Sequence, residues 1–266
     1  MTSLQNLIRR VEIYSEEKTV NLQSYLNLGS IEINSIVEDR ENVKRKILEK
    51  TLIIMRTIQM NENLPDVLKQ RYIKLEKVYK TLDYKVRTIE AELLYRGLVG
   101  TNEGFGRLAF DFGLCWDSIL QLPFFPSSSI KGATRVIADA VVEGNEDIGM
   151  RISKDDVERI FGYSEEGRAS MGTVIFHDAY PVKPSDKGLI LEPEVITPIY
   201  KGSGEEHLAS PNPISFLTIA RGVKFNFLLA SKSNTDLNIA EKCLKRALEY
   251  GIGAKTLIGY SIFKVY

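Results

Sequence analysis

The sequence has few residues of the kinds that build covalent or metal-based sites. Only two cysteines are present, Cys115 and Cys243, and they lie far apart without a CxxC pair. We therefore expect neither a disulfide framework nor a zinc knuckle, and predict that both are buried thiols. No spacing unites Asp111, Asp117 and Asp178 into a metal site, so we predict neither a metal nor a cofactor.

The sequence also lacks long apolar runs and an excess of charge of either sign. No stretch of about 18 apolar residues occurs, and residues 1–10 lack the apolar core of a signal peptide, so we expect a cytoplasmic protein without a membrane partner. Lys and Arg total 35, as do Asp and Glu, giving zero formal charge. Many autonomous nucleic-acid binders have a global basic field, which this balance excludes. Any polyanion site must be local or completed by neighbouring subunits.

Glycine, in contrast, is concentrated near the end of the chain, in residues 251–261. Glycines let a backbone approach another molecule closely, so the segment predicts an anion-binding loop. A P-loop is excluded because Ala254 separates Gly253 from Lys255. A dinucleotide fingerprint is excluded because a helical pattern precedes the glycines and an alternating segment follows them. The candidate residues of this loop are Gly251, Gly253, Lys255, Thr256, Gly259 and Tyr260.

The first third of the chain reads as helical. Apolar residues recur at helical spacing within 43–58 and again within 64–82, and Pro65 suits the first turn of the second helix. The charged run at 39–46 is interpreted as a solvated helix face, with contact to nucleic acid or a partner as the alternative. We predict a helical N-terminal region over residues 1–84.

From residue 85 the pattern changes to a mixture of strands and helices. The predicted strands cover 86–99, 172–181, 194–200, two segments within 214–229, and 260–265; the predicted helices begin at 127–129, 155 and 238. The order matches an α+β fold with a ferredoxin-like (RRM-type) βαββαβ core and insertions, over residues 85–266. The turn-rich segment 201–213 is long for a structureless loop, which is typical of functional loops.

A second anion site is predicted where residues 127–135 open a helix. Any of the three serines at 127–129 can cap the helix, and Lys131 and Arg135 follow at i and i+4. Exposed amides beside two cations favour phosphate. The alternative is that the serines and cations serve only capping and solubility. The candidate residues are Ser128, Ser129, Lys131, Gly132 and Arg135.

Three segments in this order resemble the RAMP superfamily of CRISPR effector proteins, and within it the sixth subunit of type III-B (Cmr) complexes. They are Leu122–Arg135, His177–Pro181 and Gly251–Tyr260. The resemblance covers residues 86–266. Many family members end the loop with Gly-Tyr-Gly, whereas Ser261 takes the last place here, which puts the loop's final turn in question.

The resemblance implies a non-catalytic subunit that binds guide RNA near the 3′ end of the crRNA. The implied partners are crRNA, target RNA, the backbone RAMP subunit and the RAMP subunit that caps the 3′ end. Lys131, Arg135 and Lys255 would then neutralise phosphates, the loop glycines would admit the RNA backbone, and Tyr260 would stack on a base. The loop at 201–213 is the candidate for the thumb that disturbs the guide:target duplex.

Two other functions stay open. Some RAMP proteins are metal-independent endoribonucleases, but the only histidines are His177 and His207. We expect His177 to make a structural hydrogen bond and His207 to be exposed or to contact RNA, so we predict no catalytic residue. The third possibility is a scaffold whose glycine loop only packs subunits together.

Overall fold

The computed structural model describes residues 21–27, 64–102, 104–105, 110–165, 167–197 and 214–266. The chain divides into two compact units. The first unit takes residues 1–61, 100–123 and 188–219, and the second takes 62–99, 124–187 and 220–266. The charged run at 39–46, the candidate thumb at 201–213 and His207 lie outside the described residues.

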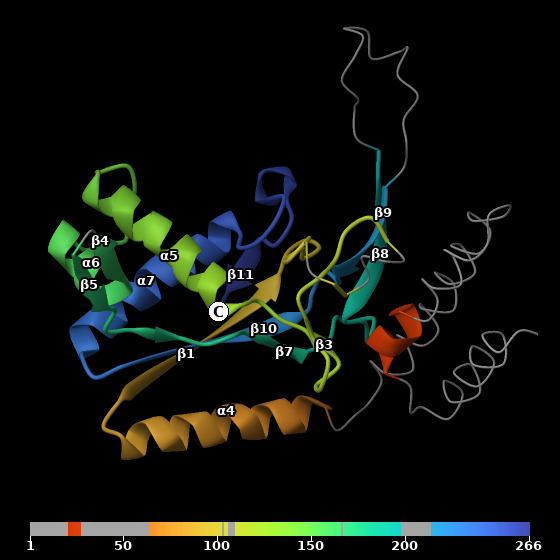
Figure 1. Cartoon of the computed structure of the whole chain (residues 1–266), viewed down its shortest axis with the longest axis horizontal. Helices are drawn as coiled ribbons and strands as arrows, with labels where there is room; N and C mark the ends of the chain where they lie inside the picture. Colours follow the sequence, from red (N-terminus) through yellow and green to blue (C-terminus); the bar gives the residue numbers. More distant parts are fainter. Residues whose placement is uncertain (1–20, 28–63, 103, 106–109, 166, 198–213) are drawn as a thin grey trace, which may run out of the picture. The chain divides into compact units, whose positions relative to one another are not determined.

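The second unit is built on a five-stranded antiparallel sheet (Figure 1). Its order is β11, β1, β10, with β10 pairing on its other side with both β6 and β7. The strands are β1 (Lys85–Leu93), β6 (Ile175–Phe176), β7 (Tyr180–Lys183), β10 (Lys224–Ser231) and β11 (Phe263–Val265).

Helices cover both faces of this sheet. α5 (Ser127–Val142), α6 (Lys154–Phe161) and α7 (Asn234–Tyr250) lie on one side, and α4 (Leu64–Thr81) lies on the other (Figure 1). On the α5 and α7 side, four phenylalanines from three segments pack together, with ring centroids 5.2 to 6.5 Å apart. They are Phe125, Phe225, Phe227 and Phe263, each at most 1% exposed. Burial of these rings fixes the face that the two helices must cover.

α4 is held to the sheet by two tyrosines. The Tyr72 hydroxyl donates to the Asn226 carbonyl at 2.9 Å and accepts from the Tyr180 N–H at 3.2 Å. Burial raises the pKa of Tyr72 to about 12, which keeps the hydroxyl protonated as a donor. Near the other end of the helix, the Tyr79 hydroxyl lies 2.7 Å from His177 Nε2. The helix predicted over 64–82 is confirmed and packs on this sheet, while the boundary at residue 84 stays a prediction.

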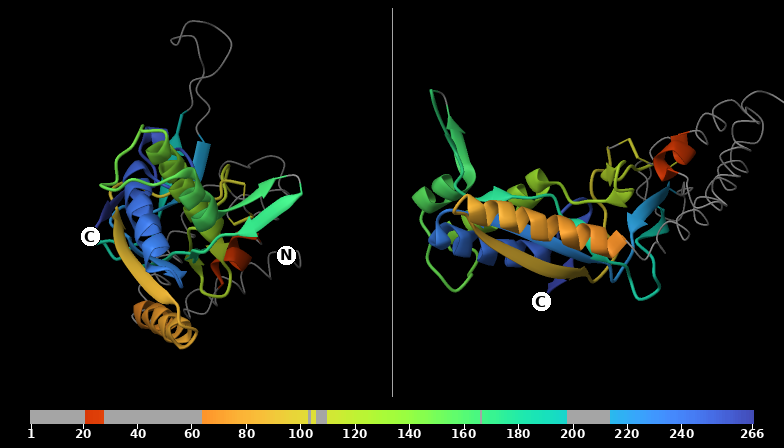
Figure 2. Two further views of the ribbon diagram at one scale, coloured as in Figure 1. Left: turned by 90° about the vertical axis from the view of Figure 1, so that its left-hand side faces the viewer. Right: turned by 90° about the horizontal axis from the view of Figure 1, so that it is seen from below.

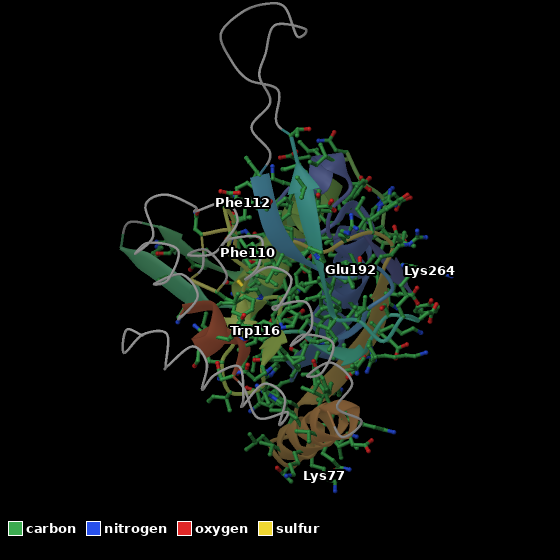
Figure 3. The ribbon with its side chains drawn as sticks, turned by 90° about the vertical axis from the view of Figure 1, so that its right-hand side faces the viewer. Lys77, Phe110, Phe112, Trp116, Glu192 and Lys264 are labelled. Carbon is green, nitrogen blue, oxygen red and sulfur yellow. The ribbon has the colours of Figure 1, made fainter. Side chains whose placement is uncertain are left out.

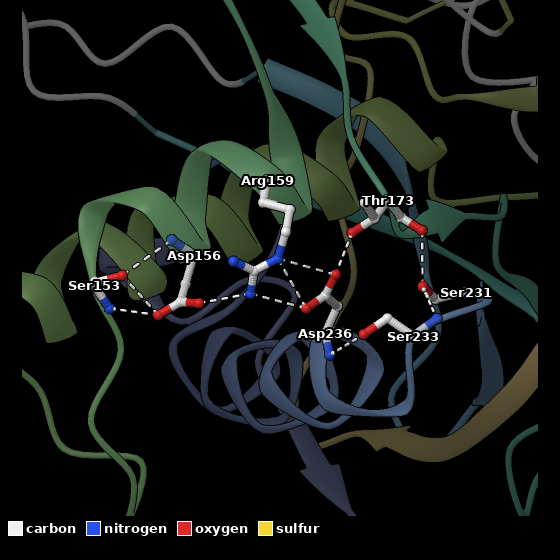
Figure 4. Close-up of polar contacts among 7 residues, drawn as sticks. All are labelled: Ser153, Asp156, Arg159, Thr173, Ser231, Ser233 and Asp236. Atoms are coloured by element: carbon white, nitrogen blue, oxygen red, sulfur yellow. Dashed lines mark hydrogen bonds and ion pairs between the residues drawn. The ribbon is translucent and has the colours of Figure 1, made fainter.

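A polar network around the buried carboxylate of Asp236 joins α6 to the start of α7 (Figure 4). Arg159 donates from Nε and Nη2 to the Asp236 carboxylate at 3.0 to 3.3 Å. Thr173 Oγ1 donates to the same carboxylate at 2.7 Å, and Arg159 also pairs with Asp156 at 2.6 Å. Since Asp236 is only 3% exposed, this network compensates a buried charge.

A hairpin of β4 (Gly162–Glu165) and β5 (Arg168–Met171) projects from the second unit (Figure 2). All four residues of β5 are exposed, and Met171 is 92% exposed. A Cβ on Gly172, at the base of the hairpin, would lie 2.4 Å from the Ile160 carbonyl oxygen. This hairpin was not predicted, because exposed strands lack apolar alternation.

The first unit contains two further antiparallel pairs. They are β2 (Trp116–Asp117) with β3 (Leu122–Pro123), and β8 (Leu191–Ile196) with β9 (Ile214–Ile219). Residues 22–27 form a short helix, and the Leu22 N–H donates to Gln121 Oε1 at 2.8 Å. Phe112, which is labelled in Figure 3, packs its ring edge-on against Phe216 with centroids 5.1 Å apart.

Several predicted boundaries differ from the observed ones. The strand predicted over 86–99 ends at Leu93, because the chain bends at Leu94 and Tyr95. The strand predicted over 172–181 is split into β6 and β7. The two strands predicted within 214–229 are confirmed as β9 and β10, which pair with other strands and not with each other. The burial of Cys115 and Cys243 is also confirmed.

Candidate nucleic-acid interface

The glycine loop, residues 251–261, begins where α7 ends. The Gly251 N–H donates to the Ala247 carbonyl at 2.9 Å, and Gly251 takes a φ of 99° that terminates the helix. The chain then passes through a short 3₁₀ turn, η2 (Thr256–Ile258), before it enters β11. Lys255, immediately before η2, has a φ of 59°.

Gly253 is required by the protein's own backbone. Its φ is 125°, and an added Cβ would lie 2.5 Å from the Leu98 carbonyl oxygen. The same carbonyl accepts from the Ala254 N–H at 2.8 Å. The close approach that the sequence assigned to an RNA backbone is here made by the segment that follows β1.

Gly259 differs, because an added Cβ would meet no atom within 4 Å. Its φ of 97° shapes the turn, but the space beside it is open. Of the three loop glycines, it is the one beside which another molecule has room to approach.

Ser261 closes the loop in place of the glycine that is common in the family. It has a φ of 58° and is fully buried. Its Oγ accepts from the Leu98 N–H at 2.9 Å and donates to the Leu98 carbonyl at 3.2 Å. These two bonds offset the strain of a left-handed non-glycine residue, which is about 1 to 2 kcal/mol. The final turn is therefore stabilised by the serine side chain.

The outer part of the loop is apolar. Leu257 is fully exposed and Ile258 is 64% exposed, whereas Tyr260 is only 9% exposed. The ring that was predicted to stack on a base therefore presents little surface to solvent.

α5 begins differently from the prediction. The expectation that a serine caps this helix is wrong: the capping residue is Pro126, and no side chain caps the helix there. The ring of Pro126 fixes its φ, here −62°, which suits an extended residue before a helix. All three serines lie inside the first turn. The Ser127 N–H instead donates to the carboxylate of Asp178 at 2.7 Å. One of the backbone N–H groups that we predicted to bind phosphate is therefore already bonded to a carboxylate of the protein.

One face of α5 remains available beyond this first amide. Ser128, Lys131, Gly132 and Arg135 share it by spacing, opposite the buried stripe that contains Ile130. Ser128 and Gly132 are exposed, and an added Cβ on Gly132 would meet no atom within 4 Å. Small side chains beside two cations let a polyanion approach this face closely. Ser129 is half-buried and lies off this face.

The two cations on this face differ in how they are held. Arg135 Nη1 donates to the Gly162 carbonyl at 3.1 Å, and its Nε lies 3.8 Å from the Asp139 carboxylate. Lys131 makes no ion pair or hydrogen bond within the described residues. Arg135 is therefore a preoriented charge and Lys131 an adaptable one.

The sheet face beneath α4 is unsuited to nucleic acid. On the part of β1 next to β11, Glu90 and Glu92 pair with Lys224 at 3.2 and 3.9 Å. The Tyr266 hydroxyl donates to Glu92 at 2.7 Å, and the ammonium groups of Lys224 and Lys264 lie over the Tyr266 ring. RRM domains stack bases on sheet aromatics, but here the central strand carries paired carboxylates.

His177 and Asp178 each bond with a residue from another element. His177 Nε2 bonds with Tyr79, which confirms the predicted structural hydrogen bond, while Asp178 holds Ser127. Burial lowers the pKa of His177, so the imidazole is neutral at pH 7. Asp111 and Asp117 each accept backbone N–H bonds at 2.9 Å. Among the described residues, no three acidic, histidine or cysteine side chains are grouped to hold a metal.

Comparison with known proteins places the chain in a family. The sequence model of the RAMP superfamily matches residues 107–264, more than half of the chain. The chain belongs to the RAMP superfamily. It is 31% identical to CRISPR system CMR subunit Cmr6 of Saccharolobus solfataricus over 251 residues, 92% of this chain and 83% of the relative.

Solved structures point the same way. A chain in the cryo-EM structure of the type III-B Cmr-beta complex bound to cognate target RNA matches with a TM-score of 0.77 at 27% identity, covering 99% of this chain and 97% of that one. A shorter match, 34% identical over 85 residues, is to the CRISPR system Cms endoribonuclease Csm3 of Streptococcus thermophilus, covering 31% of this chain and 38% of that one. The similarity to these two Cmr proteins covers 92% and 99% of this RAMP protein, so it includes residues that precede the sheet.

In the part of the chain that the structure describes, no helix is both long enough and apolar enough to span a membrane.

Proposed function

We propose that this RAMP protein is a non-catalytic, crRNA-binding subunit of a type III-B CRISPR effector complex, positioned near the 3′ end of the crRNA in the cytoplasm. The observation that carries the proposal is the match over 99% of the chain to a subunit of an RNA-bound type III-B complex. Its partners would be crRNA, target RNA, the backbone RAMP subunit and the 3′-end capping RAMP subunit.

The fold supports a more detailed assignment. We interpret the second unit as a ferredoxin-like βαββαβ core, in which α5 and α7 are the two helices and the order β11, β1, β10, β6/β7 supplies the four strand positions. The helical region 1–84 and the RAMP domain 85–266, with its thumb at 201–213, are part of this proposal. α4 then adds a third layer to the core.

The RNA contacts in this proposal come from the exposed face of α5 and from the glycine loop. Lys131 and Arg135 neutralise phosphates, Ser128 and Gly132 leave room for the sugar-phosphate chain, and Lys255 adds a charge. Ser129, Thr256 and the loop glycines stay in the proposed set, with Gly259 the most open. Because the net charge is zero, neighbouring subunits must supply part of the field.

The endoribonuclease alternative has less support. Its sequence basis is a match over 31% of the chain to a protein named as an endoribonuclease. A general base must reach the 2′-hydroxyl, and His177 is instead engaged with Tyr79 on the α4 side of the chain.

Photo-cross-linking tests the proposal. The full chain is assembled with the other subunits and a crRNA carrying 4-thiouridine near its 3′ end, and cross-linked peptides are identified by mass spectrometry. We expect cross-links within 127–135 and 251–260. Cross-links confined to other subunits would leave the chain a scaffold and refute the RNA-binding role.

For the nuclease alternative, target cleavage is measured in complexes carrying His177→Gln with Asp178→Asn. We expect cleavage to be undiminished. A loss of cleavage with intact assembly would reverse the assignment.

A further inference from the structure

We propose that Tyr95, in the bend after β1, is the side chain that stacks on a nucleobase of the bound RNA; this inference rests on the proposed RNA-binding function. The sequence assigned stacking to Tyr260, but that ring is 9% exposed, whereas Tyr95 is 55% exposed. A base can stack only on a ring face that solvent also reaches. Exposure therefore favours Tyr95.

Backbone hydrogen bonds on both sides of Tyr95 tie it to the glycine loop. The Leu94 N–H donates to the Ile262 carbonyl at 2.9 Å, and the Ser261 N–H donates to the Arg96 carbonyl at 2.9 Å. The bend and the end of the loop thus form one paired segment. An RNA strand that follows the loop passes beside the Tyr95 backbone.

The glycine loop also pairs with Leu98, two residues after Arg96. Leu98 receives the Ala254 N–H and exchanges two hydrogen bonds with the Ser261 hydroxyl. Gly253 fits against the Leu98 carbonyl only because it lacks a Cβ. This dense pairing holds Tyr95 in a fixed place relative to the loop, which lowers the entropic cost of stacking.

The side chain of Tyr95 is also uncommitted. Within the described residues it makes no hydrogen bond, ring contact or cation–π contact, in contrast to the other exposed tyrosines near the chain's end. Tyr250 bonds with Glu146 and Arg246, and Tyr266 bonds with Glu92. Arg96, the next residue in the sequence, adds positive charge beside Tyr95, which suits a site where phosphates and bases are held together.

The test uses the full chain assembled with its neighbouring subunits and a single-stranded guide RNA that carries 2-aminopurine near its 3′ end. Stacking on tyrosine quenches this fluorophore. We expect Tyr95→Ala to relieve the quenching and to weaken RNA retention about tenfold, and Tyr95→Phe to preserve both. Tyr266→Ala is the matched control, because Tyr266 is 58% exposed but its hydroxyl is bonded to Glu92.

The outcomes separate this inference from the proposed function. If Lys131→Ala weakens RNA binding while Tyr95→Ala leaves fluorescence and retention unchanged, the chain binds RNA and the assignment of Tyr95 is wrong. If Tyr95→Ala lowers subunit assembly but not RNA binding, Tyr95 faces a protein neighbour and the inference also fails. If none of the variants alters binding of the guide, the proposed function fails as well.

Discussion

The carboxylate of Asp178 accepts a hydrogen bond from the backbone N–H of Ser127 at 2.7 Å. Asp178 precedes β7, and Ser127 opens α5, so one bond joins the segment before β7 to the helix that carries Lys131. A negative charge at the start of a helix is stabilised by the helix dipole and by the unpaired amides there. The helix N-terminus is thus neutralised internally, which leaves the exposed side-chain face of α5 as the part of the helix that we propose for RNA contact.

Removing this carboxylate should loosen the start of α5. We expect Asp178→Ala to lower the free energy of unfolding by about 1 to 2 kcal/mol, because it deletes a cap-like acceptor. Asp178→Asn keeps an acceptor oxygen and should cost less. Urea unfolding of the full chain measures both. The control is Asp139→Ala on the exposed side of the same helix, with an expected change within about 0.5 kcal/mol; equal losses at the two positions would contradict this role.

The Arg159–Asp236 pair predicts a larger effect. The Asp236 side chain is 4% exposed, and its removal leaves Arg159 and Thr173 without their main acceptor. We expect Asp236→Ala to destabilise the chain by about 3 kcal/mol. Glu158→Gln, which breaks the exposed pair with Lys154, should cost less than about 0.5 kcal/mol. Thermal unfolding distinguishes them, and a small effect of Asp236→Ala would mean that the network is dispensable.

Acid should weaken the cap of α6. The backbone N–H of Ser153, followed by Arg159, lowers the pKa of Asp156 from 3.8 to about 2. Because the folded pKa lies below the unfolded one, the stabilisation is complete above about pH 4 and is lost as the pH falls through about 2. Asp156→Asn should therefore cost about 1 kcal/mol at pH 7, and the difference from wild type should vanish near pH 2. A difference that is constant from pH 7 to pH 2 would contradict the role of the ionised carboxylate.

The sequence predicted the elements whose packing is regular. The pattern of α7, the strand pair around Arg221 and Gly222, and the helix at 64–81 all follow from apolar periodicity on one face. The β4–β5 hairpin was not predicted, because its exposed strands carry no apolar periodicity. The end of β1 was missed because Leu94 and Tyr95 are apolar but exposed, so composition could not mark the bend.

The sequence predicted which segments form the candidate interface, but not the contacts and burial of their individual residues. Glycine spacing located the loop, but only the fold shows that Gly253 is needed against Leu98, which lies far away in the sequence. The burial of Tyr260 and the exposure of Tyr95 likewise depend on tertiary packing. We predicted a serine cap for α5 from residue type alone. The observed acceptor at the start of α5 is Asp178, and no local sequence pattern reveals its position.

Two glycines should respond oppositely to alanine. Gly253→Ala places a Cβ 2.5 Å from a carbonyl oxygen at a φ of 125°, so we expect a loss of about 3 kcal/mol in stability. Gly132 lies within α5 with open space around its Cβ position, so Gly132→Ala should stabilise the chain by about 0.5 to 1 kcal/mol. Differential scanning calorimetry measures both. A neutral Gly253→Ala would show that the contact with Leu98 relaxes freely.

Charge removal on α5 and the loop should reduce the salt dependence of RNA binding. Each phosphate contact contributes about one unit to the slope of log K against log salt. We expect Lys131→Ala and Lys255→Ala each to reduce that slope by about one in the assembled complex, uniformly across guide sequences, since phosphate contacts carry no base information. Lys77→Ala, on the outer side of α4 (Figure 3), is the control and should leave the slope unchanged. If the Lys77 variant changes the slope and the other two do not, the RNA follows the α4 side of the sheet, and the interface assigned to α5 and the glycine loop is wrong.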